Sequence, residues 1–240
     1  MTLVKETEAH LQGDPDVAGL LGITPRPFEG FADLAGALLN AFGGVPSDIV
    51  RRVYAASPEL VELSLHDIAE TARRNFEPGG AVAALLFARG VHAVMAHRIA
   101  HQLWEEGDHP LASAVKSRLG RAFSTDIHPA ARIGAGFWLD HGLGFVAGET
   151  CQIGQDVSIW HNVTLGSTLS DSGPQRHPTI GDGAVIGAGA MILGNVTVGA
   201  RANVGAGAIV ITDVAPATVV VGAKARHVGA AKISFSDQQE

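Results

Sequence analysis

The sequence predicts an α+β protein: an all-helical N-terminal domain followed by a left-handed parallel β-helix of hexapeptide repeats with one ejected loop. Two periodicities carry this prediction. Apolar residues recur every three or four positions up to about residue 124, and every six positions afterwards. In addition, the 30 glycines become dense only after Ile127. Since glycine tolerates sharp turns, this density indicates a chain that turns at short, regular intervals.

Residues 1–27 combine prolines, glycines and acidic side chains with little periodicity, which predicts a loosely ordered lead-in. Lys5, Glu6 and Glu8 stand where a secretory signal would need an apolar run, so we expect a cytoplasmic protein. The single cysteine, Cys151, has no partner for an intrachain disulfide. A formal net charge of −7 disfavours nucleic acid and anionic membranes as partners.

The helical domain is expected over residues 28–124. Ser57 followed by Pro58 is typical of a helix start, with the serine as cap and the proline in the first turn. The segment from Ala81 to Glu106 predicts one long helix, with too many charged and histidine residues to lie in a bilayer. A proline-containing break then precedes a last helix over residues 111–122.

The six-residue period defines the β-helix, expected over residues 125–229, and leaves residues 230–240 as a C-terminal tail. Each hexad gives a short strand and a corner, and three hexads give one triangular coil of about 18 residues. The period is interrupted by a polar stretch, residues 166–174, which must leave the prism as a loop. The residues at the six-residue spacing are Ile127, Ile133, Leu139, Phe145, Cys151, Val157 and Val163, then Ile180, Ile186, Ile192, Val198, Val204 and Val210.

Polar residues suited to catalysis cluster in the first coils and in the loop. Asp126 and His141 are slightly less than one coil apart, so we expect them in adjacent layers and in contact. A carboxylate bonded to one imidazole nitrogen fixes the tautomer and raises the basicity of the other nitrogen. This pair would suit a general base acting on a hydroxyl group. By contrast, His92, His97 and His101 of the long helix are expected to serve packing or solvation.

In several motifs the sequence resembles the bacterial and plant serine acetyltransferases, members of the hexapeptide-repeat acyltransferase superfamily. The resemblance runs from about Ala69 to Gly229. The repeats by themselves indicate only the superfamily, and the motif in the helical part narrows the resemblance to this family. The matching segments are Gly90–Trp104, Asp126–Gly134, Leu139–Gly142, Gly148–Thr150, Val163–Gly166, Arg176–Pro178 and Ile186–Asn195.

The resemblance implies acetyl transfer from acetyl-CoA to L-serine, giving O-acetylserine for cysteine biosynthesis, by general-base catalysis in a ternary complex. His141 matches the base that takes the proton of the serine hydroxyl, and Asp126 matches the residue that orients this base. Asp140, Arg176 and His177 match residues that hold the amino acid. The guanidinium of Arg176 is suited to clamp a carboxylate at two points.

The resemblance also implies that CoA lies along an edge of the prism, where backbone and small side chains let the pantetheine approach closely. Two cations near the end of the chain suit a CoA phosphate. No metal is expected. The residues expected to bind CoA are Gly166, Ser167, Ala188, Ala206, Lys224 and Arg226.

The chain departs from the family pattern at two substrate positions. Asn75, assigned to substrate binding, replaces an aspartate that holds the substrate ammonium, and Glu77 is a nearby candidate for the missing charge. Gln175 replaces another aspartate, and the loop is one residue longer. These changes leave the acceptor open between serine and another hydroxy-amino acid such as homoserine.

Two alternatives from other classes also stay open. A γ-type zinc hydratase on the same fold needs three histidines across a trimer interface, and His161 has no histidine close in sequence. A non-catalytic scaffold would use the prism only to trimerise. The resemblance implies trimers or dimers of trimers with sites between subunits. Residues 234–240 lack the terminal isoleucine that docks family members to O-acetylserine sulfhydrylase, so we expect weak or no such complex.

Overall fold

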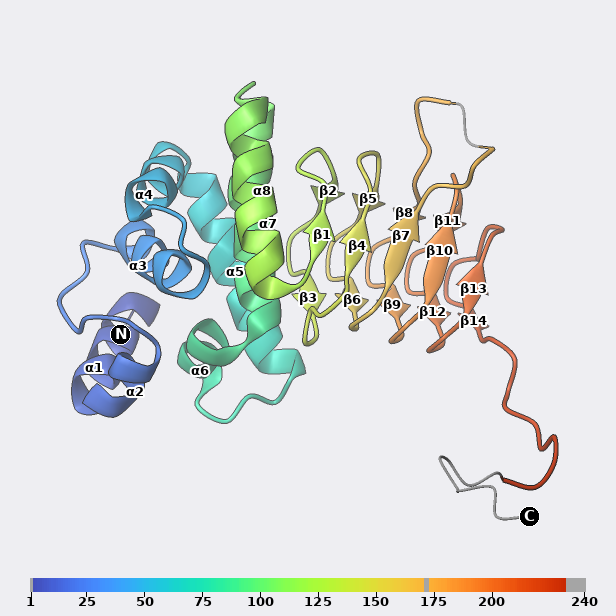
Figure 1. Ribbon diagram of the computed structural model, residues 1–240, viewed down its shortest axis with the longest axis horizontal. Helices are drawn as coiled ribbons and strands as arrows, with labels where there is room; N and C mark the ends of the chain where they lie inside the picture. The colour runs from blue at the N-terminus through green and yellow to red at the C-terminus, as the bar shows by residue number, and fades with distance from the viewer. Residues whose placement is uncertain (1, 171–172, 232–240) are drawn as a thin grey trace, which may run out of the picture.

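The computed structural model describes residues 2–170 and 173–231, which form a helical body joined to a stack of short parallel strands (Figure 1). The helices are α1 (Leu3–Gly13), α2 (Pro15–Leu20), α3 (Phe31–Gly43), α4 (Ser47–Ala56), α5 (Pro58–Arg74), α6 (Gly80–Phe87), α7 (Arg89–Glu105) and α8 (His109–Phe123). The strands are β1 (Asp126–Ile127), β2 (Arg132–Ile133), β3 (Trp138–Leu139), β4 (Val146–Ala147), β5 (Gln152–Ile153), β6 (Ser158–Ile159), β7 (Thr164–Gly166), β8 (Thr179–Ile180), β9 (Val185–Ile186), β10 (Met191–Leu193), β11 (Thr197–Val198), β12 (Asn203–Val204), β13 (Ile209–Val210) and β14 (Val219–Val220).

Residues 3–20 form the helices α1 and α2, so the expectation of a loosely ordered lead-in is wrong there. The Asp14 carboxylate caps α2 by accepting a hydrogen bond from the Val17 N–H at 3.2 Å. The Glu8 carboxylate accepts the Phe28 N–H at 2.6 Å, which ties α1 to the segment before α3. Short helices of this kind are stabilised mainly by tertiary packing, which sequence periodicity does not reveal.

The region expected to form one long helix consists of two, α6 and α7, which meet at a bend of 73°. Ala88 between them is extended, with φ −82° and ψ 107°. The bend brings Gly90 against the Leu139 carbonyl oxygen, where a Cβ would lie only 1.7 Å away. The prediction of a helix start at Ser57 is confirmed, because its hydroxyl accepts the Leu60 N–H at 3.3 Å.

Within residues 2–170 and 173–231, no single helix is long and apolar enough to cross a bilayer. The bent pair of α6 and α7 reaches that length and composition only when both helices are taken together.

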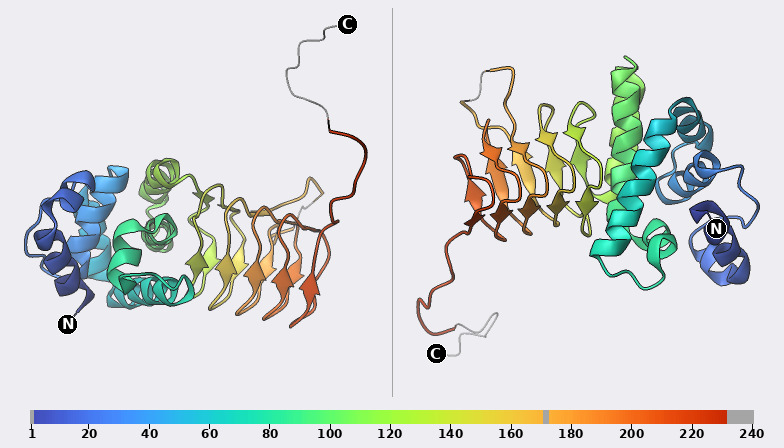
Figure 2. Two further views of the ribbon diagram at one scale, coloured as in Figure 1. Left: turned by 90° about the horizontal axis from the view of Figure 1, so that it is seen from below. Right: turned by 180° about the vertical axis from the view of Figure 1, so that it is seen from behind.

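The strands stack into three parallel sheets, which form the faces of a prism (Figure 2). Sheet A contains β1, β4, β7, β10 and β13; sheet B contains β2, β5, β8 and β11; and sheet C contains β3, β6, β9, β12 and β14. In each strand from β1 to β13 the second residue is small or aliphatic, points inward and is buried. The predicted fold class, a left-handed parallel β-helix after a helical domain, is confirmed. We call the corners where the chain passes from sheet C to sheet A the CA edge, and those from sheet A to sheet B the AB edge.

Two corners are longer than the others. Thr164 pairs with Met191, 27 residues further along, whereas Val146 pairs with Thr164, 18 residues further along. The long spacing contains the predicted loop, which leaves the prism at the AB edge after β7 and projects from it in Figure 1. Asp126 pairs with Val146, 20 residues along. The two additional residues lie at the first CA-edge corner, residues 140–145.

A buried ion pair fastens the helical body to the first coil. Oδ2 of Asp67 in α5 lies 3.0 Å from Nε of Arg98 in α7, and the two side chains are 4% and 2% exposed. The Arg98 guanidinium also donates to the carbonyls of Ile133 and Gly134, and the Asp67 carboxylate accepts the Phe137 N–H. Desolvation raises the pKa of Asp67. The helices and the β-helix are therefore joined through polar groups at the end of the prism.

Candidate active site

His141 lies at the first CA-edge corner, on a tight turn. Its backbone is left-handed, with φ 60°, and Gly142 follows with φ 73°. The Gly142 N–H donates to the Asp140 carbonyl at 2.7 Å, which closes the turn. A left-handed conformation of a non-glycine residue costs on the order of 1–3 kcal/mol and is often found at functional sites. Here it presents an imidazole whose side chain is 63% exposed.

Two neighbours hold the His141 ring. Its Nε2 atom lies 3.4 Å from Oδ2 of Asp140. One coil further along, the His161 ring packs against it edge to face, with 5.5 Å between centroids. The His161 Nδ1 atom is buried and has no hydrogen-bond partner in the part of the chain that the structure describes. His161 was not among the residues predicted for the site, and its position directly below His141 is visible only in the stacked coils.

A cavity of about 370 Å³ opens beside His141. It lies between the end of α5, the bend between α6 and α7, and the first CA-edge corner. The predicted substrate residues Asp140 and Asn75 both line it, together with Glu77 and Arg89. The structure thus brings an imidazole, two carboxylates, an amide and a guanidinium around one space.

Asp126 is not part of this cluster. Its side chain is 63% exposed and forms an ion pair with Lys116 of α8. It lines a separate cavity on sheet A, and its ion-pair partner is Lys116, whereas that of His141 is Asp140. The predicted contact between these two residues is therefore absent within this chain. The reason is geometric: Asp126 points outward from a strand of sheet A, whereas His141 sits in the lengthened corner beside it.

Arg176 and His177 lie at the AB edge, at the base of the ejected loop. The His177 side chain is buried, and its Nδ1 accepts the Thr150 N–H at 3.2 Å. The Thr150 hydroxyl accepts the N–H groups of Arg176 and His177 at 2.9 and 3.1 Å. The Arg176 guanidinium is ion-paired with Glu149. Thr150 and Glu149 thus shape this part of the site, although only the Gly148–Thr150 motif pointed to them.

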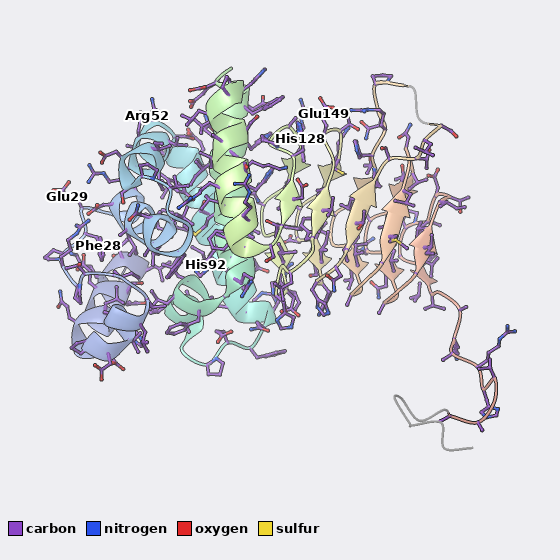
Figure 3. The ribbon with its side chains drawn as sticks, in the orientation of Figure 1. Phe28, Glu29, Arg52, His92, His128 and Glu149 are labelled. Atoms are coloured by element: carbon purple, nitrogen blue, oxygen red, sulfur yellow. The ribbon has the colours of Figure 1, made fainter. Side chains whose placement is uncertain are left out.

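Within one chain, sheet A separates this AB-edge group from the His141 cavity. Figure 3 shows Glu149 and His128 together on the edge from which the loop projects. The Gln175 amide donates to the carbonyls of Thr150 and His177 at 2.7 and 2.6 Å, so it stabilises the loop base. Burial lowers the pKa of His128.

The residues expected to bind CoA fall into two groups. Ala188 and Ala206 lie on the CA edge in the coils beyond His161. Along this edge the Gly189 N–H donates to the His161 carbonyl at 3.0 Å, and the Gly207 N–H to the Ala188 carbonyl at 2.9 Å. Because the side chains in these last two corners are small, an extended ligand can approach the backbone closely.

The remaining four of these residues lie elsewhere. Gly166, predicted to begin the loop, is instead the last residue of β7, and Ser167 follows it at the AB edge, across sheet A from the two alanines. Lys224 and Arg226 are exposed in the segment after β14. No ion pair involves either cation within the described residues. The predicted CoA residues therefore do not form a single groove in one chain.

Other reactive side chains are buried in structural positions. Burial raises the pKa of Cys151 to about 12, so its thiol stays protonated at neutral pH. Burial lowers the pKa values of His92 and His97 in α7. Among residues 2–170 and 173–231, no three His, Cys, Asp or Glu side chains are grouped so that they could hold a metal ion.

Residues 177–212 match the bacterial transferase hexapeptide (six repeats) family. Over 182 residues, 76% of its length, the chain is 45% identical to the serine acetyltransferase of Escherichia coli strain K12. The aligned segment covers 66% of that relative, slightly less than two thirds of its length.

Two solved structures are similar over nearly the whole chain. The Neisseria gonorrhoeae serine acetyltransferase in complex with serine has a TM-score of 0.84 and 37% identity, over 94% of this chain and 95% of that one. The Brucella abortus serine acetyltransferase in complex with coenzyme A has a TM-score of 0.83 and 36% identity, over 97% of this chain and 95% of that one.

Proposed function

The chain belongs to the serine acetyltransferase family, and from this premise we propose that it transfers the acetyl group of acetyl-CoA to the hydroxyl of L-serine. The observation that carries the proposal is the exposed His141 imidazole, which lies beside the Asp140 carboxylate at a cavity of about 370 Å³. The products are O-acetylserine, a precursor for cysteine biosynthesis, and free CoA.

In the proposed mechanism, His141 takes the proton of the serine hydroxyl as its oxygen attacks the thioester carbonyl carbon. The carbon–sulfur bond then breaks, and the CoA sulfur leaves with the proton returned by the imidazolium. General-base assistance of this kind contributes roughly 100- to 10,000-fold in rate. No covalent bond to the protein is needed, because both substrates are bound at once.

The site is proposed to be complete only between subunits. Arg176 and His177 lie at the AB edge of this chain, whereas His141 lies at the CA edge. If the prisms assemble as a trimer, the AB edge of one subunit can face the CA edge of the next. Arg176 would then exchange Glu149 for the carboxylate of the amino acid. We propose a trimer, or a dimer of trimers joined through the helical parts.

Asp126 is proposed to orient the base in the assembled site. Its carboxylate is exposed on sheet A, beside the corner that carries His141, and would have to leave Lys116 to do so. Exposed ion pairs of this kind are worth about 0–1 kcal/mol, so the exchange costs little.

Acetyl-CoA is proposed to lie along the CA edge, with its thioester at His141 and its pantetheine over Ala188 and Ala206. Gly166 and Ser167 would line the same groove from the AB edge of the neighbouring subunit. Lys224 and Arg226 follow the last coil and are proposed to contact a CoA phosphate.

The cellular setting is also a proposal. We propose a cytoplasmic enzyme without a metal cofactor. Because the chain belongs to the serine acetyltransferase family, we favour this function over the zinc hydratase and the non-catalytic scaffold. Homoserine stays an alternative acceptor because of Asn75 and Gln175. The expectation of weak binding to O-acetylserine sulfhydrylase rests on residues 234–240, which lie outside the described residues.

An acceptor screen tests the proposal. The protein is incubated with acetyl-CoA and serine, homoserine or threonine, and free CoA is measured with a thiol reagent. We expect the highest kcat/KM with serine. Zero thiol release with every acceptor, from protein that is folded and oligomeric, would reject the function.

A further inference from the structure

Glu77 occupies the cavity of His141 in a defined geometry. It is half-buried and lines the same space as Asp140. The Asn75 side-chain amide donates to Oε2 of Glu77 at 2.6 Å. This bond leaves Oε1 with no hydrogen bond from any described residue, so one carboxylate oxygen is fixed and the other is available to a ligand.

The backbone directs Glu77 toward the cavity by an uncommon turn at the end of α5. The Asn75 N–H bonds to Thr71 at 2.9 Å and the Glu77 N–H reaches back to Ala72 at 3.0 Å, as in a Schellman cap. Phe76 between them has φ 49°, although this position usually requires glycine. Its ring is 89% exposed, so the conformation is not explained by burial of the ring.

The charges of the cavity define the ligand. Glu77 and Asp140 are its carboxylates and Arg89 its one guanidinium. Asp140 already lies beside His141, so Glu77 is the carboxylate available at the α5 side of the space. Glu70 of α5 is also acidic and close in sequence, but its carboxylate is paired with Arg73 and does not line the cavity. Beside the Glu77 carboxylate, a ligand ammonium group is therefore favoured over a ligand carboxylate.

We infer that Glu77 binds the α-ammonium of the acceptor and selects an amino acid over a simple hydroxy acid. This inference deepens the proposed function and rests on it. Asn75, which the sequence assigned to substrate binding, is then a positioning residue that acts through Glu77. The longer glutamate side chain, two residues further along, supplies the charge that the neutral Asn75 lacks.

The test compares Glu77→Gln with the control Glu62→Gln, an exposed glutamate on α5, the helix that precedes Glu77. The amide keeps the size of the carboxylate and removes its charge. Because a charge-assisted hydrogen bond is lost, we expect KM for serine to rise about tenfold or more in Glu77→Gln. KM for acetyl-CoA should stay unchanged, and Glu62→Gln should match the wild type.

A second acceptor separates recognition from a structural effect. 3-Hydroxypropanoate, which is serine without its ammonium, is used as acceptor or as competitive inhibitor. In Glu77→Gln, the kcat/KM or inhibition constant of 3-hydroxypropanoate should stay within about twofold of the wild-type value. The double variant Asn75→Asp with Glu77→Gln, which restores a carboxylate at this side, should recover part of the serine affinity. An unchanged KM for serine, or equal losses for both ligands, would overturn the inference.

Failure of the inference is distinguishable from failure of the proposed function. If the wild type releases no CoA with serine, the proposed function is rejected. Serine binding is then measured by titration calorimetry without acetyl-CoA. Weaker binding to Glu77→Gln than to the wild type, by about tenfold, would still support the role of Glu77. Equal binding, or no binding to the wild type, would reject it.

Discussion

The Nε2 atom of His141 lies 3.4 Å from Oδ2 of Asp140, the residue directly before it in the chain. The Asp140 side chain is 15% exposed and that of His141 is 63% exposed. The imidazole therefore lies beside a carboxylate and stays largely accessible from the cavity. Both residues belong to one turn, whose Asp140 N–H is held by the Ile159 carbonyl of the next coil at 2.8 Å.

His141→Ala is expected to lower kcat by about 100- to 10,000-fold, because the general base is removed. The melting temperature should change little, since the side chain is largely exposed. His10→Ala, at an exposed histidine on α1, is the matched control and should keep full activity. Thiol release and circular dichroism are measured on all three proteins. Unchanged turnover of His141→Ala would refute the assignment of the base.

Asp126→Asn and Lys116→Gln separate the two partners of the exposed ion pair. If Asp126 orients the base in the assembled site, Asp126→Asn should reduce kcat at least about tenfold. Lys116→Gln frees the carboxylate and should retain or raise kcat. Steady-state kinetics at saturating acetyl-CoA measure both. The role proposed for Asp126 fails if its variant is as active as the wild type.

Gly90→Ala is expected to disturb the contact between α7 and the first CA-edge corner. The new Cβ would lie 1.7 Å from the Leu139 carbonyl oxygen, which is backbone and cannot swing away. We expect a loss of at least about 1–3 kcal/mol in the free energy of unfolding. Gly19→Ala in α2, where no atom lies within 4 Å of the added carbon, serves as control. Urea unfolding of the two variants should differ clearly.

Asp67→Asn is expected to destabilise the protein by about 3–5 kcal/mol, because it leaves the buried Arg98 guanidinium without a counter-charge. Arg73→Gln breaks an exposed pair with Glu70 and should cost about 0–1 kcal/mol. Chemical denaturation at pH 7.5 measures both losses. Similar losses in the two variants would contradict the structural role of the Asp67–Arg98 pair.

The free energy of unfolding should decrease as the pH is lowered, in part because His92 is buried. This ring is packed between Phe42 and Phe123, and burial lowers its pKa to about 4. The unfolded pKa is about 6.5. Between these values the unfolded chain binds more protons, so the stabilisation present above pH 6.5 is lost as the pH falls toward 4. His92→Phe removes this titration. Urea midpoints at pH 7.5 and 5 should therefore differ less in the variant, and an equal difference would contradict the prediction.

The strand register after Leu139 differs from the predicted one. Phe145, predicted to occupy the same strand position as Leu139, lies two residues before the corresponding residue, Ala147. Each hexad buries both its strand residue and the residue two positions earlier, so Phe145 and Ala147 are both buried. The apolar period of six therefore continues unchanged across a two-residue insertion. That insertion, which creates the corner of His141, could not be seen in the pattern.

The sequence by itself determined the helical part, the coiled prism and the ejected loop, because a six-residue repeat with glycine at its corners has few other ways to bury its apolar residues. It also pointed to His141 and Asp140 through local motifs. Only the tertiary structure decided that Asp126 pairs with Lys116, that Arg176 lies on another edge, and that Glu77 enters the cavity. The Asp126–Lys116 pair joins neighbouring elements, α8 and β1, whereas the positions of Arg176 and Glu77 depend on segments further apart in the chain. Their geometry depends on a helix bend, a left-handed residue and an inserted turn, none of which changes the periodicity of the sequence.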